Sequence, residues 1–283
     1  MGVLTATIGF VLCRPFRAVL AGIVTLAVLV PLAACATDSA TVSPAHPTAS
    51  APSVMPSRSP IPTPTPTQPP TQPPTPTPPV FDKTALSIND PTSIWLVVDK
   101  LRPLRPIAFV PPDLIQTPVP HLNPPTLRTE AANAIVAMFA AAKTEGAGGM
   151  QLQSAYRSYA VQVQVYNGYV ASVGTATADS QSARPGFSEH QTGLAADISA
   201  LPLTCALDAC FGQTPQGIWL AANAYRFGFL LRYPAEKTAV TGFIYEPWHF
   251  RFVGVSLATD MKRTGVTTLE EFFGLSTAPT YAP

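Results

Sequence analysis

A proline-rich tract between residues 36 and 80 limits what this chain of 283 residues can fold into. The tract consists mainly of Pro, Thr, Ser and Ala, and Asp38 and Arg58 are its only Lys, Arg, Asp or Glu residues. Because it has few large apolar side chains to bury, it cannot offset the entropy lost on ordering. We expect a disordered linker near polyproline II, reaching on the order of 140 Å when extended.

The first 35 residues have the features of an export signal. Arg14 and Arg17 precede an apolar run over residues 18–34, which is short for a membrane-spanning helix. The run leads into Leu-Ala-Ala-Cys ending at Cys35, which resembles the lipobox of bacterial lipoproteins. In lipoproteins the signal is cut before this cysteine, whose thiol carries diacylglycerol. The resemblance implies a lipid anchor at Cys35, and an uncleaved anchor helix is the alternative. Both place the rest of the chain outside the membrane.

The charge balance argues against two classes of partner. The chain has 17 Lys and Arg residues, of which Arg14 and Arg17 lie in the signal, so 15 remain against 16 Asp and Glu. This near-neutral balance argues against the excess of basic residues that nucleic-acid-binding proteins usually have. It also argues against a polybasic surface for membrane binding. We expect a monomer.

Two cysteines lie close together in the exported part of the chain. Cys205 and Cys210 are five residues apart, and an exported pair this close indicates a disulfide. The small loop that it closes would contribute roughly 2 kcal/mol to stability. A zinc site is the less favoured interpretation, since no histidine is nearby.

The remaining sequence predicts one folded domain over residues 81–276, followed by a flexible tail over residues 277–283. Periodicity and capping residues predict helices over residues 129–143 and 160–173 and from Thr214 to about Gly228. Strands are expected over residues 150–156, 195–199, 229–233 and 243–253. The mixture predicts an α+β fold, with a small, mainly antiparallel sheet and flanking helices.

Two histidines stand near carboxylates in a pattern suited to metal chemistry. His190 and Asp197 lie in one segment, and Glu246 and His249 lie in another. Two histidines and an aspartate can supply three zinc ligands and leave the fourth position for water. Zinc-bound water loses its proton near neutral pH, and a nearby glutamate can accept that proton. Glu246 is the candidate for this role.

The spacing within each segment requires a break in regular backbone. His190 and Asp197 are seven residues apart, so an unbroken strand would point them to opposite faces. Gly193 provides the break that would direct both toward one metal. Glu246 and His249 are three apart, and a turn at Pro247 between them would serve the same purpose.

These segments resemble the VanY-type zinc D-alanyl-D-alanine carboxypeptidases, whose pattern is Ser-x-His-x-x-Gly-x-Ala-x-Asp followed by Glu-x-x-His. The chain matches at Ser188, His190, Gly193, Ala195, Asp197, Glu246 and His249. Residues 154–162 and 229–234 resemble two further elements of the family, and the likeness covers about residues 94–255. It implies the fold of the hedgehog and D-Ala-D-Ala peptidase type.

The resemblance also implies a role for particular side chains. One zinc ion would be held by His190, Asp197 and His249. Glu246 would be the general base and acid, and Arg157 would stabilise the developing oxyanion, as a permanent cation in a dry cleft does well. The pocket for the terminal residue would be lined by Gln162, Ser188, Tyr233 and Trp248. Glu189 is expected to be solvated.

The expected function is removal of the terminal D-alanine from peptidoglycan stem peptides, by an enzyme anchored to the membrane and facing the cell wall. L,D-carboxypeptidase or endopeptidase activity on the same polymer remains an alternative. A non-catalytic wall-binding module that keeps the metal is the alternative from another class. Such a module would not need both Glu246 and Arg157, so their presence favours an enzyme.

Overall fold

The structure is a computed structural model, and it describes residues 80–282. The expected export signal, Cys35 and the linker up to residue 79 lie outside the described residues, so they stay predictions. Among residues 80–282, no helix is both long and apolar enough to cross a membrane.

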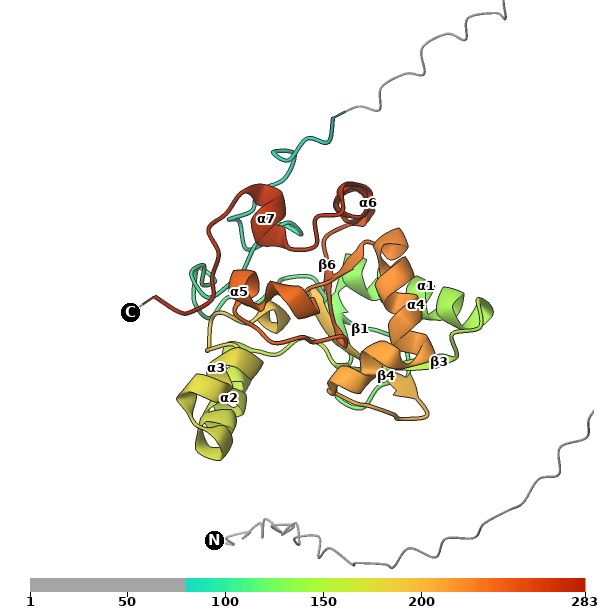
Figure 1. The fold of residues 1–283 in the computed structure, drawn as a ribbon, viewed down its shortest axis with the longest axis horizontal. Coiled ribbons are helices and arrows are strands. Elements are labelled where there is room, and N and C mark those ends of the chain that lie inside the picture. Colours follow the sequence, from blue (N-terminus) through green and yellow to red (C-terminus); the bar gives the residue numbers. More distant parts are fainter. Residues whose placement is uncertain (1–79, 283) are drawn as a thin grey trace, which may run out of the picture. The chain divides into compact units, whose positions relative to one another are not determined.

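A four-stranded antiparallel sheet with the strand order β3-β4-β6-β5 lies at the centre of the domain (Figure 1). Its strands are β3 (Gly149–Ser154), β4 (Ala195–Leu201), β5 (Phe229–Leu231) and β6 (His249–Phe252). A second, two-stranded antiparallel sheet consists of β1 (Leu114–Gln116) and β2 (Thr126–Arg128). This confirms the α+β class with small antiparallel sheets.

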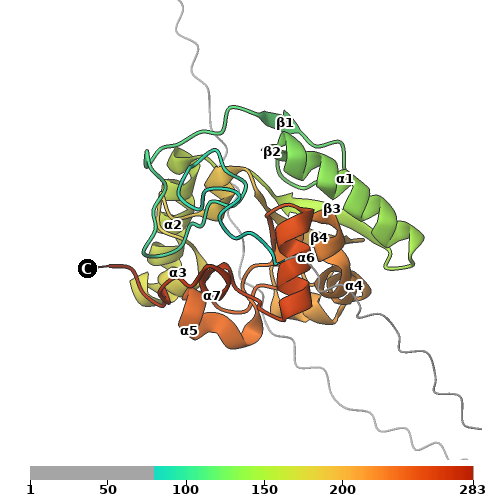
Figure 2. The same ribbon diagram turned by 90° about the horizontal axis from the view of Figure 1, so that it is seen from above.

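Seven α-helices and four 3-10 turns surround the strands in the described part of the chain. The helices are α1 (Thr129–Thr144), α2 (Tyr159–Val173), α3 (Thr175–Gln181), α4 (Pro215–Asn223), α5 (Thr238–Thr241), α6 (Val255–Thr264) and α7 (Leu269–Phe273). The 3-10 turns are η1 (Glu189–Thr192), η2 (Ala209–Gln213), η3 (Ala224–Phe227) and η4 (Ala235–Lys237). Helices α2 and α3 lie side by side, away from α1 and α4 (Figures 1 and 2).

The central sheet has one apolar face and one polar face, because side chains alternate along a strand. Ala196 and Ile198 of β4 and Phe250 of β6 are buried in the main core. Helix α1 packs on this core through a stripe at helical spacing that includes Ile135 and Met138. The side chains between them on β4 and β6 point to the opposite face, where the polar residues of the site gather.

A second core forms where the N-terminal part of the domain meets α6 and α7. Trp95 is buried, donates from its indole Nε1 to the Val253 carbonyl at 3.0 Å and stacks near Phe81 and Phe273. Val97 and Leu257 belong to the same cluster. Residues 95–98 of the apolar run are buried and Ile94 is half-buried, although the run forms no strand.

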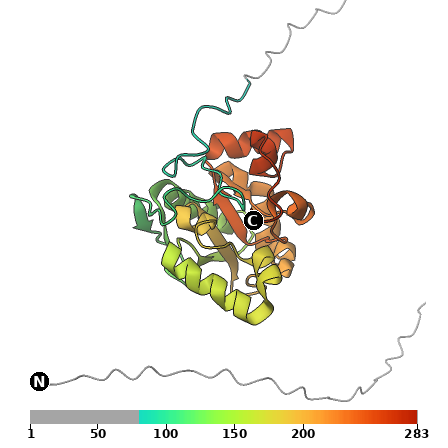
Figure 3. The same ribbon diagram turned by 90° about the vertical axis from the view of Figure 1, so that its left-hand side faces the viewer.

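Three expectations about the fold differ from the structure. The helix expected from Thr214 to about Gly228 is α-helical only at Pro215–Asn223 and is followed by the 3-10 turn at Ala224–Phe227. The strand expected over residues 243–253 is a strand only at His249–Phe252, since the chain turns around Pro247 before it. The tail expected to be flexible from residue 277 is held against the domain at Ala278 and Tyr281. Ala278 is fully buried and donates its amide to the Val240 carbonyl at 2.7 Å, while Tyr281 is half-buried (Figure 3 faces this end of the chain).

Candidate active site

Three side chains that could hold a metal ion meet on the polar face of the sheet. Asp197 of β4 pairs directly across from His249 of β6, so their side chains point to the same face. His190 comes from η1. The distances are 3.2 Å from His190 Nε2 to Asp197 Oδ2 and 3.1 Å from His249 Nδ1 to Asp197 Oδ1. All three residues are buried, and one ligand atom from each lies within 4.8 Å of the others.

Gly193 allows His190 and Asp197 to approach each other. It ends η1 in the left-handed conformation, with a φ of 67°, which favours glycine. A Cβ at this position would lie 2.8 Å from Leu114 Cδ2, so the space is also closed to larger residues. The break expected from the sequence is therefore present at this glycine.

The hydrogen bonds of the two imidazoles leave one nitrogen of each free for a metal. His190 Nδ1 lies 2.7 Å from the Ala155 carbonyl oxygen, which can only accept. His249 Nε2 lies 3.3 Å from Glu189 Oε2. These partners assign the protons to those two nitrogens and leave His190 Nε2 and His249 Nδ1 facing Asp197. Orientation of a metal-binding imidazole by a carbonyl or carboxylate is usual in metal sites.

The electrostatics of Asp197 fit a cation. Ser154 donates its hydroxyl to Oδ2, whereas Oδ1 is buried and has no hydrogen-bond partner among residues 80–282. Burial alone would raise the pKa of Asp197, but His190 and His249 outweigh it and hold that pKa well below its usual range. Burial would lower the pKa of His249, yet the neighbouring carboxylates of Asp197 and Glu189 raise it to about 9. The cluster thus favours positive charge, and two imidazoles with one carboxylate are a zinc donor set.

The expectation that Glu189 is solvated is wrong. Its side chain is fully buried beneath the histidines and accepts from Arg232 Nε at 2.9 Å and from Arg251 Nη1 at 2.8 Å. Arg232 also binds Glu270 through both terminal nitrogens, at 2.9 and 2.7 Å. Burial would raise the pKa of Glu189, but the two guanidinium groups and His249 hold it well below the usual range. Two arginines and two glutamates therefore form a buried ion-pair network beneath the site, in which the positive and negative charges balance.

Glu246 lies beside the three-residue cluster. A turn at Pro247 brings the His249 amide to the Glu246 carbonyl at 3.0 Å, so both side chains face one cavity. Glu246 Oε2 is 3.8 Å from His249 Nδ1. Burial is the main cause that raises the pKa of Glu246, to about 8, and a bound cation would lower that pKa. The carboxylate is placed to exchange a proton with a group bound at the cluster.

Arg157 brings a permanent positive charge to the same cavity. Its backbone is fixed by a hydrogen bond from its amide to the His190 carbonyl at 3.2 Å. Its Nε is buried and has no hydrogen-bond partner in the described part of the chain. Burial lowers the pKa of Arg157, while Asp197 and Glu246 oppose that change. The guanidinium is thus free to bind an anionic oxygen.

The site opens into a cavity of about 470 Å³. Of the four residues expected to line it, Ser188, Tyr233 and Trp248 do so. Gln162 does not: it is fully buried behind the wall, where its Nε2 donates to the Ala183 carbonyl at 2.6 Å. Other lining residues were not expected from the sequence, including Ser154, Tyr169, Phe243 and Tyr245.

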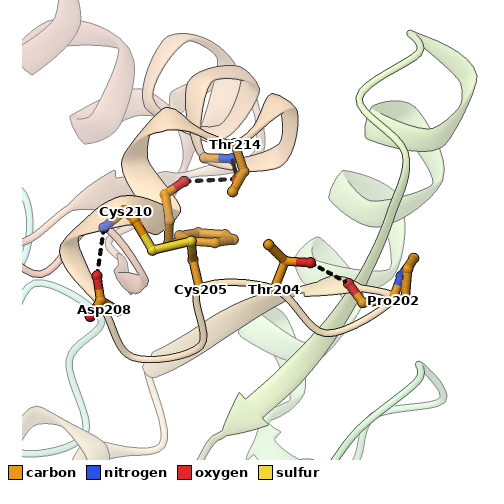
Figure 4. The surroundings of a disulfide bond; sticks show 8 residues. Pro202, Thr204, Cys205, Asp208, Cys210 and Thr214 are labelled. Carbon is orange, nitrogen blue, oxygen red and sulfur yellow. Dashed lines mark hydrogen bonds between the residues drawn. A yellow bond between two sulfur atoms is a disulfide. The ribbon is translucent and has the colours of Figure 1, made fainter. Parts of the chain in front are cut away.

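A disulfide loop between β4 and α4 forms part of the cavity wall. Cys205 and Cys210 are bonded, and the Asp208 carboxylate accepts from the Cys210 amide at 2.9 Å (Figure 4). Residues 207–209 of this loop line the cavity. Just beyond it, a Cβ at Gly212 would lie 2.3 Å from the Tyr245 hydroxyl, so the loop sits directly against the segment that carries Glu246.

Comparison with known proteins agrees with this geometry. A family model described as VanY, D-alanyl-D-alanine carboxypeptidase, matches residues 124–255. The putative carboxypeptidase YodJ of Bacillus subtilis is 40% identical over 191 residues, which cover 66% of this chain and 69% of the relative. This chain belongs to the VanY family of D-alanyl-D-alanine carboxypeptidases.

Solved structures of similar sequence include members with different specificities. The LdcB LD-carboxypeptidase shares 39% identity with a TM-score of 0.60, over 66% of this chain and 88% of that chain. A variant of the vancomycin-resistance D,D-pentapeptidase VanY in complex with Zn(II) shares 32% identity with a TM-score of 0.53, over 64% of this chain and 98% of that chain. The VanY family chain described here is accordingly a zinc metallopeptidase.

Proposed function

We propose that the chain is a D,D-carboxypeptidase that releases the terminal D-alanine from stem pentapeptides of peptidoglycan. The observation that carries this proposal is the combination in one cavity of a three-residue metal cluster with Glu246 and Arg157, neither of which belongs to the cluster. A metal site that only stabilises a fold has four protein ligands and no need of a free acid and cation beside it. This separation of roles supports a catalytic site.

His190, Asp197 and His249 would hold the zinc, which would supply a Lewis acid and lower the pKa of a bound water molecule. Glu246 then accepts the proton of the attacking water and delivers it to the nitrogen of the departing D-alanine. Arg157 binds the carbonyl oxygen of the scissile amide as negative charge develops on it. The hydrogen bond from the Arg157 amide to the His190 carbonyl at 3.2 Å ties the backbone that carries Arg157 to η1, which carries His190.

The cavity wall supports recognition of a small terminal residue. Tyr233 and Phe243 pack with ring centroids 4.6 Å apart, and Tyr233 lies 4.9 Å from the His249 ring. These rings and Trp248 form an apolar side to the cavity, whereas Ser188 contributes a hydroxyl group. An apolar wall with a few polar groups suits the methyl group and the carboxylate of a terminal D-alanine.

The second candidate is an L,D-carboxypeptidase, which removes the terminal D-alanine from stem tetrapeptides. It is favoured by the likeness to the LdcB LD-carboxypeptidase at 39% identity. The two activities differ in the configuration of the residue before the scissile bond. Residues 207–209 of the disulfide loop line the cavity, so they are candidates for recognising the configuration of that residue.

The proposal includes a location. Lipidation of Cys35 would anchor the chain to the outer surface of the membrane, and residues 36–80 would serve as a tether into the cell wall. The Leu-Ala-Ala-Cys sequence and the proline-rich composition support this arrangement.

The test is to incubate the zinc-loaded full chain with synthetic stem pentapeptide and tetrapeptide and to identify the products by mass spectrometry. Release of D-alanine from the pentapeptide alone supports the D,D assignment, and release from the tetrapeptide alone supports the L,D assignment. The Glu246→Gln variant is the control for contaminating peptidases. Cleavage of neither peptide, or equal cleavage by the control, would refute the proposal.

A further inference from the structure

The C-terminal segment, residues 278–281, packs behind two walls of the substrate cavity. The first wall is residues 181–183, which end and follow α3, and the second is residues 243–245, which follow α5. The Ile244 amide of the second wall donates to the carbonyl of Ser180, the residue directly before the first wall, at 3.1 Å. In Figures 1 and 2 the C-terminal end runs past α5 and α3, on the side of the domain where these walls lie.

Lys100 fastens the segment to the second wall. Its buried Nζ donates to the Gly242 carbonyl at 2.6 Å and to the Pro279 carbonyl at 3.4 Å. The same ammonium lies 4.6 Å from the Phe243 ring centroid, a distance typical of a cation–π contact. A Cβ at Gly242, whose φ is 82°, would lie 2.6 Å from the Ala278 carbonyl oxygen. The C-terminal segment therefore packs so close to residue 242 that there is no room for a side chain there.

Tyr281 fastens the segment to the first wall. Its hydroxyl oxygen accepts from the Arg184 amide at 2.8 Å, and its ring lies 4.3 Å from the Arg184 guanidinium. The ring also contacts Phe187 edge-on, with centroids 5.1 Å apart. Arg184 directly follows the wall, and Phe187 directly precedes Ser188, which lines the cavity. Tyr281 therefore contacts both ends, Arg184 and Phe187, of the turn that leads from the first wall to η1.

We infer that Lys100 and Tyr281 are positioning residues for substrate binding, and that residues 278–281 form a strap that fixes the two walls. The expected effect on substrate binding rests on the proposed function, whereas the strap itself does not. The hydrogen bonds and ring contacts of the strap go to Lys100, Arg184, Phe187 and Val240, none of which belongs to the metal cluster. Lys100 in turn contacts Phe243, which packs on Tyr233 beside His249. Loosening it weakens binding of the peptide terminus and leaves the metal and the proton transfer in place.

The kinetic test compares Tyr281→Ala with Tyr225→Ala in the zinc-loaded full chain. Tyr225 is a matched control because it is also half-buried and contacts a cation, Lys262 at 5.6 Å, but it lies away from the cavity. For Tyr281→Ala we expect KM for the stem peptide to rise about 5- to 20-fold, with kcat within about twofold, the pattern of lost uniform binding. Tyr281→Phe keeps the ring and loses the acceptor, so KM should rise about 2- to 3-fold. Zinc content should stay at the wild-type value in all three.

Hydrogen exchange of the zinc-loaded protein without peptide tests the strap independently of activity. The Arg184 and Ile244 amides should exchange at least about tenfold faster in Tyr281→Ala than in wild type, and at wild-type rates in Tyr225→Ala. The inference would be overturned by any of three results. These are unchanged exchange at both amides, a loss of kcat with unchanged KM in Tyr281→Ala, and an equal change of KM in Tyr225→Ala. If the wild type cleaves no stem peptide, the proposed function fails, and the exchange rates alone then decide whether the strap exists.

Discussion

Replacing Glu189 with glutamine tests whether the buried charge network supports the metal site. The Glu189 carboxylate has no exposed surface and accepts from Arg232 at 2.9 Å, from Arg251 at 2.8 Å and from His249 at 3.3 Å. With Glu270, it balances the two guanidinium groups. The Glu189→Gln change keeps the size but leaves one buried positive charge without its partner. Removing one member of a buried ion pair costs roughly 3–5 kcal/mol, and we expect a loss in this range.

The same change should weaken zinc binding, because the carboxylate orients the His249 imidazole. Loss of such a supporting partner lowers metal affinity by roughly 10- to 100-fold. Urea unfolding of the zinc-free protein measures the first effect, and competition with a chromophoric chelator measures the second. The control is Glu145→Gln, since Glu145 is 38% exposed and pairs with Arg226 at 2.8 Å. An exposed pair of this kind contributes about 1 kcal/mol or less. If the two variants lose equal stability and bind zinc as the wild type does, the role given to the network is wrong.

Three further substitutions probe other parts of the account. Arg157→Ala should lower kcat by roughly 10²–10³, as for loss of an oxyanion donor, while the zinc content measured by elemental analysis stays at the wild-type value. Gly212→Ala would place a methyl group 2.3 Å from the Tyr245 hydroxyl, so the side chain must move and KM should rise by about 3- to 10-fold; steady-state kinetics at fixed zinc would show it. Cys35→Ala should abolish metabolic labelling with a fatty-acid probe, and equal labelling of the wild type and the variant would exclude the lipid anchor.

The parts of the site that could be predicted from the sequence are those with a local pattern. His190, Asp197, Glu246 and His249 stand in two short segments whose spacing suits zinc chemistry, and Gly193 marks the break that joins the first pair. The structure brings all four side chains together. Asp197 and His249 are paired across β4 and β6, so the strand register alone places their side chains next to each other. Two short segments are therefore enough to predict this part of the site.

The parts that could not be predicted depend on contacts between distant segments. Glu189 looks like a surface residue in its own segment, because the arginines that bury it follow 43 and 62 residues later. Tyr281 lies in a Thr- and Pro-containing tail whose composition resembles a flexible end. It docks because Arg184 offers a free amide and a cation to its ring. Neither contact leaves a periodic or spacing signal in the sequence.

The measurement that tests the central claim most directly is the paired zinc content and stem-peptide turnover of Glu246→Gln. The side chain is buried 3.8 Å from His249 Nδ1 but lies outside the three-residue cluster. Glutamine keeps its size and removes the basic carboxylate. If Glu246 carries the proton without holding the metal, zinc stays fully bound while turnover falls by roughly 10²–10⁴, the usual range for general acid–base catalysis. Near-normal turnover would contradict the mechanism, and loss of zinc would show that Glu246 belongs to the metal ligands.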